Sequence, residues 1–92
     1  MNEGQEMEEQ FALLLETLKN QQMNEFRELF LALHIYEQGQ FYQSLDEKDR
    51  QHLYNYLSPK ELADMFDVIE EDNENMKDYL AEMRPSYAAD ML

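Results

Sequence analysis

The chain has 92 residues, of which 43% are hydrophobic, and it carries 21 Asp and Glu against 7 Lys and Arg, which gives a formal net charge of −14. This excess of carboxylates excludes a general nucleic-acid-binding protein, which needs a basic face for the phosphates, and argues against docking on an anionic membrane surface. The lack of cysteine excludes a disulfide framework and thiolate chemistry.

Residues 1–9 are acidic and do not resemble a secretory signal, which begins basic and then becomes apolar. The longest apolar run, residues 11–15, is far shorter than the roughly 20 residues of a membrane span. We therefore expect this segment to be soluble and to lie in the cytosol.

Apolar residues recur at positions i, i+3, i+4 and i+7 in four segments, which places them on one face of a helix. In chain order these stripes are Phe11/Leu14/Leu15/Leu18, Phe26/Leu29/Phe30/Leu33, Leu62/Met65/Phe66/Ile69 and Met76/Tyr79/Leu80/Met83. Two segments show part of the spacing, namely Leu53/Tyr56/Leu57 and Ala88/Met91/Leu92. Because no segment alternates apolar and polar residues like a strand, the sequence predicts an all-α fold.

Local signals mark where the middle helices begin. Gly39 weakens the helix expected over residues 35–45, since glycine disfavours helix interiors. Asp46 and Glu47 open the next helix, because carboxylates suit a helix N-terminus. Residues 58–61 (Ser-Pro-Lys-Glu) combine a capping serine, a proline at the first helical position and a glutamate at the third, which predicts a capping box.

The final third of the chain contains one predicted loop and two predicted helices. The acidic run 70–75 interrupts the apolar spacing and predicts a loop, with Asn73 or Asn75 as the next cap. Pro85 starts the last helix. That helix has no capping signal before Leu92, so we expect the natural chain to continue or to have been truncated here.

The ends of the helical stripes repeat. Leu33, Leu45, Leu57 and Ile69 are spaced 12 residues apart, and residues 57–66 parallel residues 83–92 with an offset of 26. Short helices repeated at this period favour a solenoid, in which each unit buries its apolar face on its neighbours. An ordinary orthogonal bundle of five or six helices is the alternative.

Three stretches resemble the cytosolic N-terminal domain of the MgtE family of magnesium transporters. Two have a proline-led start followed by a small residue, an aspartate and two apolar residues, namely Pro59 with residues 62–66 and Pro85 with residues 88–92. The third, residues 33–42, resembles an early family segment, with Ile35, Gln38 and Gly39 as departures from it. We divide the single helical domain of residues 1–92 into an N-terminal helix and linker (1–22) and the part that resembles the family domain (23–92).

The resemblance implies a right-handed superhelix of short helices. It also implies that the domain precedes CBS domains and a membrane pore in the same chain, on the cytoplasmic face of the cell membrane, in a homodimer. Weakly bound Mg²⁺ would bridge carboxylates of the N-terminal and CBS domains and hold the pore closed. By position in the motif, the implied metal ligands are Asp64 and its repeat equivalent Asp90.

Other interpretations of these residues stay open. The alternative for Asp64 and Asp90 is that both are solvated surface carboxylates. Six carboxylates fall within residues 64–74, where a divalent cation would relieve their repulsion. We expect no enzymatic activity and no nucleic-acid partner. The alternative functions are a protein-interaction domain resembling the middle domains of the flagellar motor switch protein, and an acidic mimic of nucleic acid.

Overall fold

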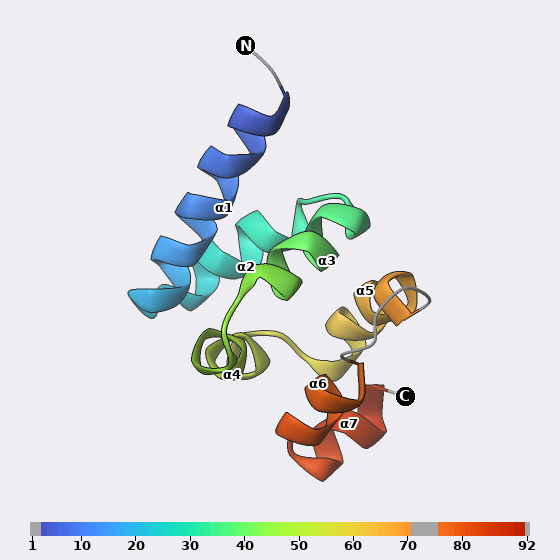
Figure 1. Cartoon of the computed structure of the whole chain (residues 1–92). Helices are drawn as coiled ribbons and strands as arrows, with labels where there is room; N and C mark the ends of the chain where they lie inside the picture. Colours follow the sequence, from blue (N-terminus) through green and yellow to red (C-terminus); the bar gives the residue numbers. More distant parts are fainter. Residues whose placement is uncertain (1–2, 71–75, 92) are drawn as a thin grey trace.

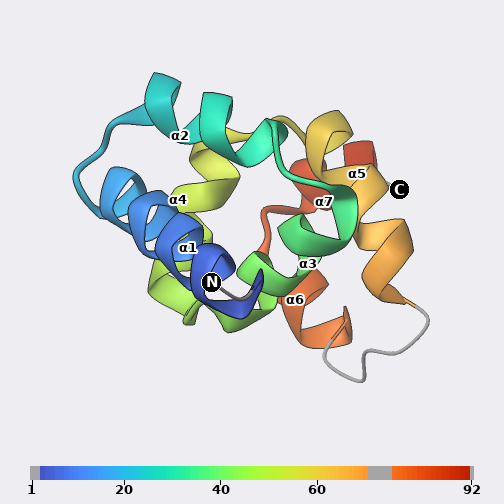
Figure 2. The ribbon, with the colours of Figure 1, turned by 90° about the horizontal axis from the view of Figure 1, so that it is seen from above.

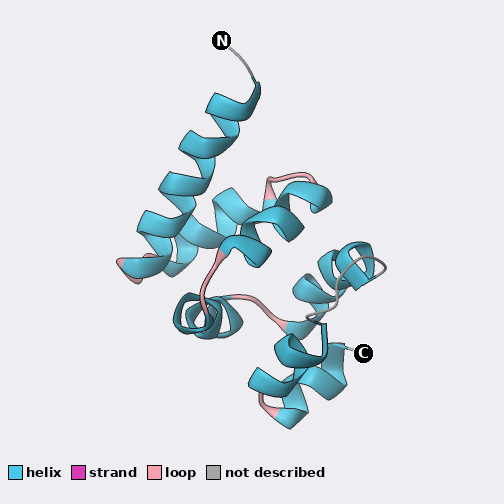
Figure 3. Cartoon of the chain, in the orientation of Figure 1, coloured by secondary structure: helices cyan, strands magenta, loops and turns pink. Residues whose placement is uncertain are grey.

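A computed structural model describes residues 3–70 and 76–91, and the regular structure within these two ranges is entirely helical (Figures 1 and 3). The helices are α1 (Glu3–Lys19), α2 (Met23–Leu31), α3 (Ile35–Ser44), α4 (Glu47–Tyr56), α5 (Pro59–Glu70), α6 (Met76–Glu82) and α7 (Pro85–Met91). The all-α prediction is therefore confirmed, while the superhelical course stays a prediction. Of the predicted loop 70–75, Glu70 ends α5; residues 71–75, with both proposed caps, lie outside the described residues.

The predicted helix starts form as the local sequence requires. The backbone N–H of Ser58 donates to Glu61 Oε1 at 2.9 Å, and the N–H of Glu61 donates to Ser58 Oγ at 3.2 Å, so the capping box is confirmed. The Asp46 side chain accepts the N–H of Asp49 at 2.9 Å and caps α4. Each cap satisfies backbone donors that a helix leaves without partners, and so fixes where the helix begins.

The segment with the weakest sequence signal is the central helix of the fold. Helix α3 spans Ile35–Ser44, and Gly39 is buried within it rather than breaking it. A Cβ atom added to Gly39 would lie 2.6 Å from Ile69 Cγ2, so glycine is what lets α3 approach α5 this closely. The helix lacks a single apolar stripe because neighbouring helices cover more than one of its faces (Figure 2).

Two successive aromatic residues of α3 belong to two different parts of the core. The ring of Phe41 lies 6.2 Å from Phe26 and 6.1 Å from Phe30, which joins α3 to α2. The ring of Tyr42 lies 5.3 Å from Phe66 and 5.0 Å from Tyr79, which joins α3 to α5 and α6. Both residues are almost completely buried. Helix α3 therefore connects an N-terminal aromatic cluster to a C-terminal one.

Helices α1 and α2 form a helical hairpin that is closed against α3. The turn places Gln21 at φ 59°, in the left-handed region that commonly ends a helix. The buried amide of Gln38 on α3 donates from Nε2 to the carbonyls of Phe30 at 3.2 Å and Leu33 at 3.3 Å. These bonds satisfy carbonyls at the C-terminal end of α2. Gln38, which departs from the family pattern, thus ties the hairpin to the rest of the fold.

Candidate functional site

Asp64 lies on the solvent-facing side of α5. The capping box at the start of α5 and the buried contacts of Leu62 and Met65 fix the rotation of this helix, so its polar residues face outward. Asp67, one turn further along, is also exposed. Positions i and i+3 are neighbours on a helix surface, so α5 presents two carboxylates side by side.

Asp90 lies on α7, which packs against α5, and it is also exposed. The hydroxyl of Tyr87 donates to the carbonyl of Leu57 at 2.8 Å and fixes α7 at the junction of α4 and α5. The two predicted ligands are thus on adjacent helices. Among the side chains that the structure describes, those of residues 8–69 and 76–91, however, no three carboxylate or imidazole groups come close enough to enclose a metal ion.

Only part of the acidic run 64–74 lies within the described residues. Glu71, Asp72 and Glu74 lie outside the described residues. The ion pairs in the described part of the chain use Asp49, Glu61 and Glu82 rather than the two predicted ligands. Asp64 and Asp90 therefore offer solvent-facing oxygen atoms, which is the donor chemistry that Mg²⁺ prefers.

A partly buried ion pair sets the position of α5 relative to α2. Arg27 donates from Nη1 to Glu61 Oε1 at 2.6 Å and from Nη2 to Glu61 Oε2 at 2.7 Å, and Nη1 also donates to the Tyr56 carbonyl at 2.9 Å. The hydrogen bonds from Arg27 lower the pKa of Glu61 to about 2, with a further contribution from those of Ser58. One carboxylate thus both caps α5 and ties it to α2.

This pKa shift predicts a pH-dependent difference in stability. Because the pKa of Glu61 is depressed, its contribution is complete above an unfolded pKa of about 4.3 and is lost as the pH falls towards 2. We expect Glu61→Gln to lower the free energy of unfolding by about 1–2 kcal/mol near neutral pH, and by progressively less between about pH 5 and pH 2. Urea unfolding of both proteins across this range measures the difference. A difference in the free energy of unfolding that stays constant across this pH range would contradict the assignment. Glu28→Gln, which changes an exposed glutamate, is the control and should have little effect.

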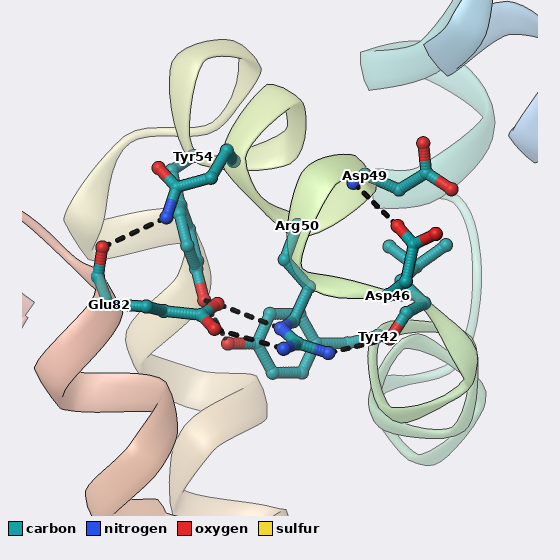
Figure 4. A network of polar contacts seen from close by, with 8 residues as sticks. Tyr42, Asp46, Asp49, Arg50, Tyr54 and Glu82 are labelled. Carbon is teal, nitrogen blue, oxygen red and sulfur yellow. Dashed lines mark hydrogen bonds and ion pairs between the residues drawn. The ribbon is translucent and has the colours of Figure 1, made fainter.

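A second polar network joins α4 to α6 and to α3 (Figure 4). Arg50 donates from Nε to Glu82 Oε2 at 2.7 Å and from Nη2 to Glu82 Oε1 at 2.9 Å. The hydroxyl of Tyr54 donates to the same carboxylate and is itself hydrogen-bonded to the hydroxyl of Tyr42. Since Tyr54 gives its single proton to Glu82, Tyr42 must be the donor between the two tyrosines. The guanidinium also lies over the ring of Tyr79, at 5.0 Å.

This network is buried enough to be structural. The side chains of Arg50 and Glu82 are only 15% and 7% exposed. Burial raises the pKa of Tyr42 and Tyr54 above the ordinary value, so both hydroxyls keep their protons. The hydrogen bonds to Glu82 raise the pKa of Arg50 as well, so the guanidinium stays charged. The network therefore fixes α6 against α4.

Sequence reasoning did not find either arginine network. The paired residues are 34 and 32 positions apart, and no local motif links them. The available signal was scarcity, since this acidic chain has only three arginines, of which Arg27 and Arg50 each form an ion pair with a glutamate.

The sequence comparison identifies the family to which the chain belongs. In residues 3–70 and 76–91, no helix combines the length and the apolarity needed to cross a membrane. The family model of the MgtE intracellular N domain matches residues 33–92, from two residues before α3 through α7 to the last residue of the chain. Because this match covers well over half of the chain, the protein belongs to the family of MgtE intracellular N domains, which are cytosolic domains of magnesium transporters.

Proposed function

We propose that this chain is a magnesium-sensing regulatory domain of a magnesium transporter. Its surface carboxylates would bind Mg²⁺ and thereby gate an associated membrane pore. The observation that carries the proposal is the exposed carboxylate of Asp64 on α5, at the motif position within the part of the chain that matches the family. Asp67 is exposed one turn further along α5, and Asp90 is exposed on α7, which packs against α5.

The residues fit one half of a site shared between two domains. Mg²⁺ is usually held by one or two carboxylates with several retained waters, and rarely by a cage made wholly of protein. A bound divalent cation supplies positive charge that offsets the repulsion between acidic surfaces. Asp64 on α5 and Asp90 on α7 hold carboxylate oxygens at the surface. The ion pair between Glu61 and Arg27 fixes the direction in which α5 presents Asp64. In this proposal the CBS domains of the parent chain supply the opposite half, within a homodimer.

Magnesium titration of the chain, followed by amide NMR shifts, tests the proposal. We expect saturable shifts in α5 and α7 with an affinity of about millimolar, because few protein ligands contribute. Asp64→Asn combined with Asp90→Asn should weaken the apparent affinity at least about fivefold, since both acidic ligands are lost. Asp78→Asn, which removes an exposed carboxylate from α6, is the matched control and should leave the affinity unchanged.

Titration with NaCl at equal ionic strength separates site binding from general screening of the −14 charge. Identical shifts with both salts, or an unchanged affinity in the double variant, would refute Asp64 and Asp90 as the ligands. An absence of any magnesium-specific shift would instead favour the protein-interaction domain.

A further inference from the structure

A groove with a volume of about 420 Å³ lies between α1 and the junction of α3 and α4. Its walls are apolar, with Phe11 and Leu15 contributed by α1, and Phe41 and Leu45 contributed by the far side. The rings of Phe11 and Phe41, which both line the groove, lie 5.4 Å apart in an edge-to-face arrangement. The volume falls within the roughly 300–1,000 Å³ typical of binding sites.

Carboxylates flank this apolar groove. Glu8 lies about two helical turns before Leu15 on α1, and Asp46 and Asp49 belong to the start of α4. None of the described residues that line the groove is cationic. Lys19 lies 4.0 Å from Asp49, with its side chain 59% exposed while that of Asp49 is 12% exposed. Arg50 donates to the carbonyl of Leu45 at 2.6 Å, but its charge is paired with Glu82. The exposed contact with Lys19 is weak and the charge of Arg50 is offset by Glu82, so the carboxylates leave the groove with a net negative charge.

We propose that this groove binds an amphipathic basic helix of a partner protein. The apolar side chains of the partner helix, one turn apart, would lie between Phe11 and Leu45. Two basic residues, each Lys or Arg and about two turns apart, would lie near Glu8 and near Asp49. A helix fits because Glu8, Phe11, Ala12 and Leu15 form an i, i+3, i+4, i+7 stripe about 10 Å long along α1.

The negative charge of the chain favours a basic partner helix in the groove over a second copy of the chain. Two copies would each carry a charge of −14 and would repel one another across an acidic groove. The proposal also goes beyond magnesium sensing, because the groove lies on α1, α3 and α4 while Asp64 and Asp90 lie on α5 and α7.

Fluorescence anisotropy with a labelled model peptide tests the proposal. The probe is a helical peptide of Lys, Leu and Ala, about 16 residues long, with lysines two turns apart and leucines between them. We expect saturable binding that Ala12→Lys weakens at least about tenfold, because the new side chain fills the groove and repels the peptide's lysines. Ala12 is exposed on α1 and lysine is a good helix former, so the fold should be kept.

Leu13→Lys is the matched control. It changes the net charge by the same amount, but Leu13 is 47% exposed and lines a smaller pocket between α1 and α2 instead. We expect it to change the affinity less than twofold. Equal losses in both variants, a larger loss in Leu13→Lys, equally tight binding of a scrambled peptide, or no binding would each overturn the proposal. Dimerisation of the chain that Ala12→Lys abolishes would place a second copy in the groove and would also overturn it.

Discussion

Replacing Arg50 by methionine is expected to lower the free energy of unfolding by about 3–5 kcal/mol, the cost of leaving a buried charge without its partner. The substitution leaves the carboxylate of Glu82, which is only 7% exposed, without its cationic partner. It also removes the hydrogen bond from Arg50 Nη1 to the Leu45 carbonyl, which is 2.6 Å long. A domain of this size has a total stability of about 5–15 kcal/mol, so the change is severe. Urea unfolding monitored by circular dichroism measures it.

Two further variants separate the charge effect from the loss of packing. Arg84→Met makes the same substitution at an exposed residue whose bond to Asn55 is 3.3 Å long, and it should cost less than about 1 kcal/mol. Arg50→Met combined with Glu82→Leu removes both charges, and should regain much of the lost stability because apolar replacements of buried pairs are often nearly neutral. If Arg50→Met costs no more than Arg84→Met, the pair is not structural.

Replacing Phe41 by alanine is expected to cost about 3–5 kcal/mol and to loosen the N-terminal hairpin selectively. Phe41 is 1% exposed, and its ring contacts those of Phe11, Phe26 and Phe30. The cavity left by the missing ring would therefore lie between α3 and the hairpin of α1 and α2. The C-terminal aromatic cluster around Tyr42 would be unaffected. Hydrogen exchange should show that amides of α1 and α2 lose more protection than those of α5.

The milder Phe41→Leu keeps the fold available for this comparison even if Phe41→Ala is largely unfolded. Tyr36→Ala removes an aromatic side chain from the same helix at a position that is 63% exposed, and it should change stability by less than about 0.5 kcal/mol. A uniform loss of protection across all helices in Phe41→Leu would mean that the two aromatic clusters unfold as one unit.

The helices were predictable because their signals are local. Ser58 and Glu61 are three residues apart, and the stripe from Leu62 to Ile69 falls on one face, so neighbours in sequence are also neighbours in space. Helix α3 was predicted less clearly because Gly39 costs helix propensity in isolation. Its benefit, close contact with Ile69, depends on a helix 30 residues away.

For the candidate site, the sequence predicted which residues could bind a metal ion but not how they are arranged in space. Its position in the motif identified Asp64 as a candidate ligand, and the structure places this residue at the surface of α5. The sequence does not show which other oxygen atoms lie near it. The groove beside α1 shows the same limit. Glu8 and Asp49 are separated by 41 positions, and they line one groove because two aromatic rings, Phe11 and Phe41, meet between them.

The adjacent placement of Phe41 and Tyr42 on α3 decides where the chain can tolerate a change in length. One residue of an α-helix turns the following side chains by about 100°. An insertion or deletion between Ile35 and Gln40 would therefore rotate both rings out of their clusters at once, and no compensating shift of a single neighbour could restore both. The turn after Lys19 has no such constraint on its exposed residues Asn20 and Gln21. Length variation among related chains should therefore accumulate in that turn and be absent from α3.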